Sequence, residues 1–225
     1  KKRLFSLASD FFAQPGELVP QACNGSMAKT KAAYRFFSNE QVTMQTLLRP
    51  HVESTIERIR SHDVVLAAQD TTTLNYTAHA PEGVGPINTN KDKAVGLLMH
   101  DTMAFTPEGT PLGLLDVQCW ARDAKRSRKK DERKKLPIEQ KESMKWLTSF
   151  RAVAEVQALC ADTMLVSVGD READIYELFH EACRDPGGPK LLARAERTRN
   201  RQVEQEHLWE KMKAEPVAGM REVHV

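Results

Sequence analysis

The sequence has little cysteine, no long apolar run and almost no net charge. Its four cysteines lie far apart and form no Cys-x-x-Cys pair, which argues against structural zinc and favours a reducing cytosol. No apolar run approaches the roughly 18 residues that cross a bilayer, so we expect no membrane partner. No signal peptide is visible, and a chain that begins at Lys1 rather than Met is compatible with a missing N-terminal piece.

A net charge of +2 does not by itself point to nucleic acid, but the basic residues are unevenly distributed. Residues 121–141 contain ten Lys and Arg against four Asp and Glu, and residues 190–201 contain five against one. Such stretches can bind phosphate groups. A solvated loop is the competing interpretation, and charge runs alone leave it open.

Hydrophobic periodicity divides the chain into a helical part and a mixed part. Apolar residues recur at helical steps in residues 1–60, where Pro50 is expected to open the last helix. The run at 64–68 has the pattern of a short strand buried on both faces. Further strands are expected at 94–105, 112–120, 163–168, 190–195 and 221–225, and helices at 142–160, 173–183 and 207–213. This order predicts a mixed α/β sheet.

Two aspartates, Asp70 and Asp170, closely follow the apolar runs 64–68 and 163–168. Because open α/β sheets build their sites at strand ends, the two carboxylates are expected to meet. Carboxylates that meet repel each other unless a cation lies between them, and Mg²⁺ or Mn²⁺ prefers such oxygen ligands. A metal pair there could hold both oxygens of a phosphoryl transfer. The structural alternative is that Asp70 is a turn residue and Asp170 a helix N-cap.

Four blocks of the sequence carry more information together than singly. They are Ala-Tyr-Arg-Phe-Phe at 33–37, Gln-Asp-Thr-Thr at 69–72, Lys-Glu-Ser-x-Lys-Trp-Leu at 141–147 and Val-Gly-Asp-Arg-Glu-Ala-Asp-Ile-Tyr at 168–176. In this order the chain resembles the DDE transposases of the insertion-sequence-4 group, which includes the Tn-five type. The second and fourth blocks are specific as a pair, whereas isolated tetrapeptides would be weak.

The resemblance implies a ribonuclease-H-like mixed sheet preceded by a small all-helical domain. It assigns residues 1–60 to DNA-end binding, 61–196 to the first part of the catalytic core and 197–225 to the start of an inserted β-rich domain. Asp70 matches the family's first catalytic carboxylate, on the first strand, and Asp170 matches the second, after the fourth strand. Both are expected to bind Mg²⁺ or Mn²⁺.

The resemblance also implies double-stranded DNA as the partner, both transposon ends and target DNA. Family members cut the element ends by hydrolysis and join the free 3′-hydroxyl to target DNA. They act as a DNA-bridged homodimer, and we expect a bacterial cytoplasmic protein associated with the nucleoid. The DNA-contacting residues that the resemblance suggests are Arg35, Arg194, Arg197 and Arg199.

Two residues keep two interpretations at this point, and a third is given one. Arg35 either contacts DNA or packs its stem on the neighbouring aromatic residues. His100 is either a core residue or lies near the metal. Glu172, close to Asp170, is interpreted as an acid in the first turn of a helix, where the helix dipole favours it.

The third carboxylate of the family is missing from this sequence. It is a glutamate in the pattern Tyr, two residues, Arg, three residues, Glu, six residues, Lys. The chain's three tyrosines fail the pattern, because Phe37, His79 and Phe179 stand where Arg is required. We therefore expect this fragment not to cleave DNA by the normal route. A non-catalytic DNA-binding or regulatory fragment, and a ribonuclease-H-like nuclease, stay open as alternatives.

Overall fold

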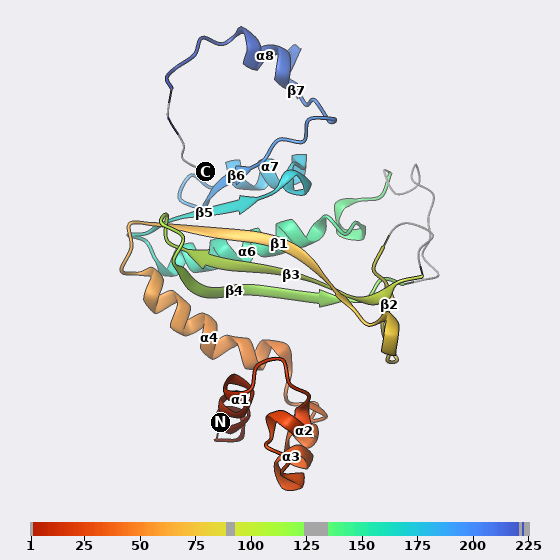
Figure 1. Cartoon of the computed structure of the whole chain (residues 1–225). Helices are drawn as coiled ribbons and strands as arrows, with labels where there is room; N and C mark the ends of the chain where they lie inside the picture. The colour runs from red at the N-terminus through yellow and green to blue at the C-terminus, as the bar shows by residue number, and fades with distance from the viewer. Residues whose placement is uncertain (1, 89–92, 124–134, 221, 223–225) are drawn as a thin grey trace. The chain divides into compact units, whose positions relative to one another are not determined.

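The computed structural model describes residues 2–88, 93–123, 135–220 and 222 of the 225-residue chain. The chain forms two compact units, Lys1–Ser54 and Thr55–Val225, and each is described by itself (Figure 1). Among the described helices, none combines the length and the apolar character needed to cross a membrane.

The first unit consists of short helices around a small core. Ser26 begins the third of them, because its Oγ accepts a hydrogen bond from the Lys29 amide at 3.4 Å. The helices are α1 (Lys2–Ala13), α2 (Val19–Ala22), α3 (Met27–Phe37) and the first part of α4 (Met44–Ile59). The buried core residues are Leu7, Cys23 and Ala33. This core is small, so many side chains of the unit face solvent.

Helix α4 begins earlier than the sequence predicted. Pro50 lies inside the helix instead of opening it, so that prediction was wrong. The helix begins at Met44, nearly two turns before Pro50, because the Thr43 hydroxyl accepts a hydrogen bond from the Thr46 amide at 3.1 Å, as an N-cap does. Proline lacks an amide hydrogen, so α4 lacks one backbone hydrogen bond at Pro50.

The second unit is built on a six-stranded mixed sheet, which confirms the predicted α/β class. Strand β1 lies centrally, antiparallel to β3 and parallel to β5. The strand order is β2-β3-β1-β5-β6, with β4 paired to β3. The strands are β1 (Val64–Asn75), β2 (Gly85–Pro86), β3 (Val95–Phe105), β4 (Pro111–Trp120), β5 (Met164–Gly169) and β6 (Lys190–Ala193). Strands β3 and β4 form the predicted hairpin, whose turn contains Gly109 at φ 92°.

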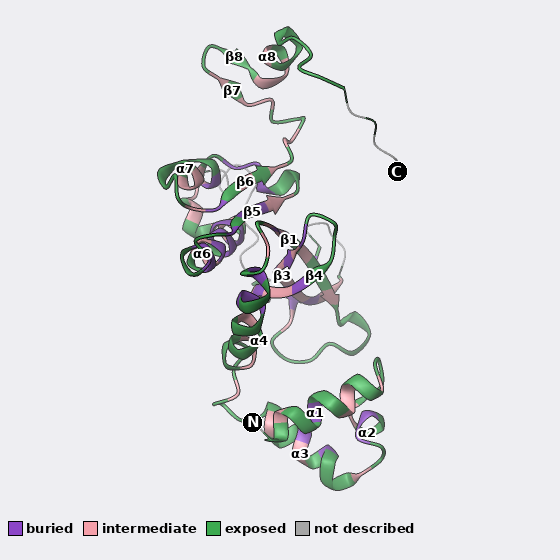
Figure 2. Ribbon diagram, turned by 90° about the vertical axis from the view of Figure 1, so that its left-hand side faces the viewer, coloured by how far each residue is buried: buried purple, intermediate pink, exposed green. Residues whose placement is uncertain are grey.

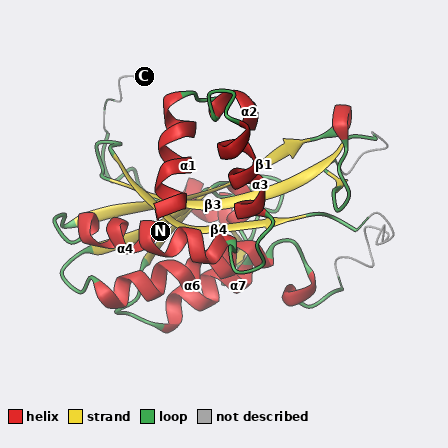
Figure 3. Ribbon diagram, turned by 90° about the horizontal axis from the view of Figure 1, so that it is seen from below, coloured by secondary structure: helices red, strands yellow, loops and turns green. Residues whose placement is uncertain are grey.

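Two helices, α6 (Met144–Leu159) and α7 (Tyr176–Arg184), pack together on the sheet (Figure 3). The predicted helix 173–183 is in fact divided into a 3₁₀ turn, η3 (Arg171–Ala173), and α7. The residues buried between these elements, which Figure 2 shows in purple, are Trp146, Leu147, Phe150, Ala173, Ile175 and Leu178. The hydrophobic core of the unit therefore lies between these helices and one face of the sheet.

Strand β1 is longer than predicted and is not buried on both faces. The apolar run ends at Ala68, but β1 continues to Asn75 because β3 pairs with it as far as that residue. Burial alternates along Val64–Gln69, as in a strand with one covered face. Asp70 is therefore a mid-strand residue and not a strand-end one.

A small hairpin and a short helix follow β6. Strands β7 (Gln202–Val203) and β8 (Glu206–His207) pair antiparallel, and α8 (Leu208–Ala214) follows at nearly the predicted residues 207–213. Most of the predicted strand 221–225 lies outside the described residues, as does most of the basic stretch 121–141.

Candidate functional site

Asp70 and Asp170 are carried by neighbouring parallel strands, Asp70 within β1 and Asp170 directly after β5. The β1–β5 register runs without a shift from Val64 opposite Met164 to Ala68 opposite Val168, so each aspartate follows the last pair of the ladder by two residues. Adjacent strands are about 4.8 Å apart. Both aspartates are exposed. The pairing of β1 with β5 therefore brings together the two segments that carry these acids, although the segments are far apart in the sequence.

Asp101 is a third acid on this face, and sequence reasoning missed it. It pairs directly with Asp70 across the β1–β3 ladder, so both side chains point to the same face. Burial raises the pKa of Asp101, and the negative charge of Asp70 raises it further. In the sequence, Asp101 is a single acid within the apolar run of β3. Its position opposite Asp70 depends on the register between β1 and β3, which the sequence does not reveal.

The acids Asp101, Asp70 and Asp170 follow one another on β3, β1 and the end of β5. Their carboxylate oxygens are the donors that Mg²⁺ and Mn²⁺ prefer, and a cation would offset the repulsion that raises the Asp101 pKa. The described part of the chain contains no group of three or more His, Cys, Asp or Glu side chains arranged to hold a metal ion. The row of acids thus matches these ions by donor chemistry only, and not by a metal-binding arrangement of three side chains.

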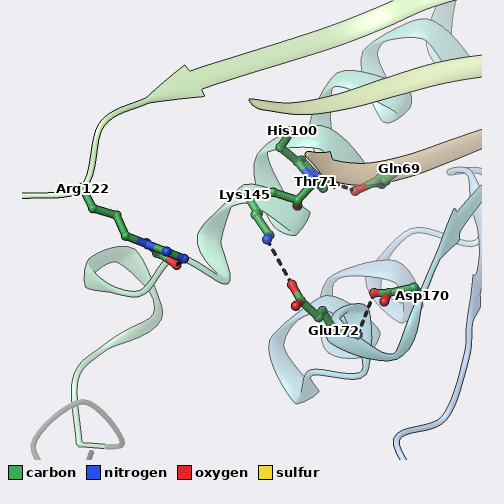
Figure 4. A network of polar contacts seen from close by, with 8 residues as sticks. Gln69, Thr71, His100, Arg122, Lys145, Asp170 and Glu172 are labelled. Atoms are coloured by element: carbon green, nitrogen blue, oxygen red, sulfur yellow. Dashed lines mark hydrogen bonds and ion pairs between the residues drawn. The ribbon is translucent and has the colours of Figure 1, made fainter. Parts of the chain in front are cut away.

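Asp170 also has a local structural role. Its Oδ1 accepts a hydrogen bond from the Glu172 amide at 2.7 Å, which caps η3 (Figure 4). Asp170 is therefore an N-cap, as the structural alternative predicts, through one of its two carboxylate oxygens. The cap belongs to η3 and not to a helix over 173–183, since α7 begins only at Tyr176.

Glu172 connects the turn after β5 to helix α6. Its Oε2 lies 3.1 Å from Nζ of Lys145, whose side chain is only 9% exposed (Figure 4). The sequence predicts Glu172 to be an acid favoured by a helix dipole, but η3, on which it lies, has only three residues. The side chain instead forms an ion pair with Lys145.

His100 lies beneath the acids, on the opposite, covered face of the sheet. Its ring is fully buried, with Nδ1 at 2.8 Å from the Thr71 hydroxyl and Nε2 at 3.4 Å from Oε1 of Gln69 (Figure 4). The Trp146 ring packs edge-on against it, with the ring centroids 4.7 Å apart. His100 is thus a core histidine that neighbours the site through the strand backbone.

The environment of His100 favours its neutral form. Burial lowers the pKa of His100 from 6.5 to about 4, and the positive charge of Lys145 adds to that effect. The negative charges of Asp116 and Asp70 oppose it but do not prevail. The imidazole is therefore uncharged at neutral pH and adds no positive charge beneath the carboxylates.

The four arginines expected to contact DNA are all exposed, but they make different contacts within the chain. Arg35 lies on α3, and Arg194 directly follows β6, where its amide donates to the Gly169 carbonyl at 3.0 Å. Arg197 follows three residues later. Arg199 differs from these, because its guanidinium donates to the backbone carbonyl of Asp174.

Within the basic stretch 121–141, the structure describes Arg122. Its guanidinium forms an ion pair with Glu142, at 2.5 Å from Nε to Oε1, and donates to the Ile87 carbonyl at 2.6 Å. These contacts hold the chain after β4 in place. Residues 124–134 lie outside the described part of the chain, so the structure does not test whether this stretch binds DNA.

The comparison with protein families gives a match at the N-terminus. Residues 1–42, which contain α1 to α3 and Arg35, match the family model described as transposase DNA-binding. All of the matched residues lie in the first unit.

The chain also has a low similarity to solved structures of the Mos1 transposase. The Mos1 mariner paired end complex with Mn has 9% identity and a TM-score of 0.31, covering 92% of this chain and 63% of that chain. A pre-cleavage Mos1 transpososome has 9% identity and a TM-score of 0.28, with the same coverage. The chain thus spans less than two thirds of the length of these proteins.

Proposed function

We propose that this chain is the end-binding and first catalytic region of a DNA transposase of the insertion-sequence-4 group. The observation that supports the catalytic part is the unshifted β1–β5 register, whose last pair, Ala68 opposite Val168, lies two residues before Asp70 and Asp170. The match of residues 1–42 to a transposase DNA-binding family supports the DNA-binding part. In its complete form the protein would cleave transposon ends and join them to target DNA, as a homodimer on the DNA.

The strand order supports a ribonuclease-H-like core. A hairpin of two strands, β3 and β4, lies on one side of β1, while β5 and β6 run parallel to β1 on the other side. In this proposal β1 is the first strand of the core, β3 and β4 are the second and third, and β5 and β6 are the fourth and fifth. The first carboxylate then lies on the first strand, and the second follows the fourth.

In this proposal Asp70 and Asp170 hold Mg²⁺ or Mn²⁺, with Asp101 as an additional carboxylate. A bound metal would offset phosphate charge and activate the attacking oxygen. The chain's own part is positioning. The β1–β3 ladder holds Asp70 opposite Asp101, and the η3 cap holds one carboxylate oxygen of Asp170 directly after β5.

Calorimetry with Mn²⁺ tests the metal site. Asp70→Asn and Asp170→Asn should each weaken Mn²⁺ binding at least about tenfold, because each removes an anionic ligand. Asp162→Asn is the matched control, since Asp162 is an exposed aspartate just before β5 and should leave the titration unchanged. Identical titrations for all four proteins would exclude this assignment.

The DNA-binding part is tested by the salt dependence of duplex binding. Each lost phosphate contact reduces the slope of log affinity against log salt by about one. Arg35→Gln should reduce this slope by about one in fluorescence anisotropy. Arg49→Gln is the control, because Arg49 is equally exposed in the first unit but lies beyond the matched residues and pairs with Glu53. A flat salt response of the wild-type chain would argue against DNA binding.

A further inference from the structure

Asp174 is a buried acid at the end of the turn that carries Asp170. Its side chain is only 4% exposed. Oδ1 accepts from Nε of Arg201 at 2.5 Å, and Oδ2 accepts from the Glu196 amide at 2.9 Å. Its backbone carbonyl accepts from the guanidinium groups of both Arg199 and Arg201. Both carboxylate oxygens are therefore bound to the segment that leaves β6.

This segment, residues 194–201, is the part of the second basic stretch (190–201) that follows β6. Its first amide, that of Arg194, extends the β5–β6 ladder by donating to the Gly169 carbonyl at 3.0 Å. Further along, Arg171 lies 3.9 Å from Glu196, so the two turns also meet through side chains. Several contacts thus connect the turn 170–174 to the basic segment next to β6, the edge strand of the sheet.

The arginines of the segment fall into two groups. Arg199 and Arg201 point their guanidinium groups at Asp174. Arg194 and Arg197 are exposed, and no hydrogen bond or ion pair of their side chains is recorded with any described residue. The backbone of Arg197 is nevertheless held, because its carbonyl accepts from the Trp209 indole at 3.1 Å.

We propose that Asp174 is a positioning residue that holds the basic segment beside the Asp170 end of the sheet. Arg199 and Arg201 serve as its internal partners, and Arg194 and Arg197 contact DNA phosphates. Arg199 is thereby reassigned from DNA contact to positioning. The DNA role rests on the proposed function, whereas the anchoring by Asp174 does not. An unpaired charge left at a buried ion pair is unfavourable, so the loss of either partner should release the segment.

The indole of Trp209 reports on this segment without any DNA. The chain has three tryptophans, and Trp120 is the internal reference because it ends β4, which lies on the other side of β1 from β5 and β6. In ¹H–¹⁵N spectra of the full chain, Asp174→Asn should shift the Trp209 indole resonance. It should also speed the hydrogen exchange of that indole at least tenfold while leaving Trp120 unchanged.

Two further variants keep this test decisive. Arg201→Gln removes the partly exposed partner and should reproduce the Trp209 change if Asp174→Asn does not fold. Asp185→Asn, in an exposed turn after α7, is the matched control and should leave both indoles unchanged. An unaltered Trp209 signal in Asp174→Asn or Arg201→Gln would overturn the proposal.

Binding to a labelled duplex of about 20 base pairs tests the role toward DNA. Asp174→Asn raises the net charge by one, so an electrostatic effect alone would strengthen binding. Positioning predicts the opposite, a weaker affinity and a salt slope reduced by up to about two, which is the slope lost in Arg194→Gln/Arg197→Gln. Tighter binding by Asp174→Asn would overturn the positioning role alone. Absence of binding by the wild-type chain would overturn the proposed function, while the Trp209 result would still decide the anchoring.

Discussion

The two faces of the central sheet use the same strands in different ways. Along β3, Leu98, His100 and Thr102 are buried, whereas the residues between them are only half-buried. The covered face carries hydrophobic packing and an uncharged histidine. The other face carries Asp70 and Asp101 directly opposite each other, and burial together with the charge of Asp70 raises the pKa of Asp101. Alternation along a strand thus allows a charged site to lie one residue away from the core.

The largest expected difference between the faces comes from two adjacent leucines of β3. Leu98→Ala should lower the free energy of unfolding by about 2–5 kcal/mol, because it leaves a cavity in the covered face. Leu97→Ala removes the same atoms from the half-buried face and should cost about 1 kcal/mol. Urea denaturation measures both values. Equal losses would show that the two faces are packed alike.

A smaller effect is expected from acid, through His100. Its pKa is about 4 in the folded chain and 6.5 ordinarily, so between these values the unfolded chain binds a proton that the folded chain does not. The stability contribution is complete above pH 6.5 and is lost toward pH 4, by up to about 1.4 kcal/mol per pH unit. Urea denaturation at several pH values should show a flatter dependence in His100→Gln than in the wild type. Parallel curves would contradict this account.

The smallest effect is expected on the acidic face. Asp101→Asn should raise the free energy of unfolding of the metal-free chain by less than about 1 kcal/mol, because it removes a repulsive charge at a partly exposed position. The same variant should weaken Mn²⁺ binding if Asp101 helps to hold the ion. Asp116→Asn serves as a contrast, since Asp116 accepts hydrogen bonds from Gln118 and Ser149 and its replacement should destabilise the chain. A destabilised Asp101→Asn would mean that its charge is paired.

Much of the secondary structure could be predicted from local patterns. The β3–β4 hairpin was predictable because two alternating runs flank a turn sequence with Gly109, and the mixed sheet followed from the order of elements. The beginning of α4 was not predicted, because the hydroxyl of Thr43 outweighs the usual preference of proline for the first turn. The far half of β1 was missed because pairing with β3, and not apolar residues, makes it a strand.

The residues of the candidate site also fall into those that local sequence patterns indicate and those that they do not. Asp70 and Asp170 could be named from the sequence, because acids after apolar runs and the blocks around them are local features. Asp101 and Asp174 could not be named. The importance of Asp101 comes from facing Asp70 across a ladder, and that of Asp174 from binding Arg201, 27 residues away.

The sequence by itself determined which segments become helices and strands, since periodicity and capping act over a few residues. It also determined that two acids follow two apolar runs. Only the tertiary structure decided that β1 and β5 pair without a shift, that Asp70 and Asp101 share a face, and that Arg199 points inward while Arg194 does not. The physical reason is that strand register and buried ion pairs depend on the packing of distant segments, which no local pattern encodes.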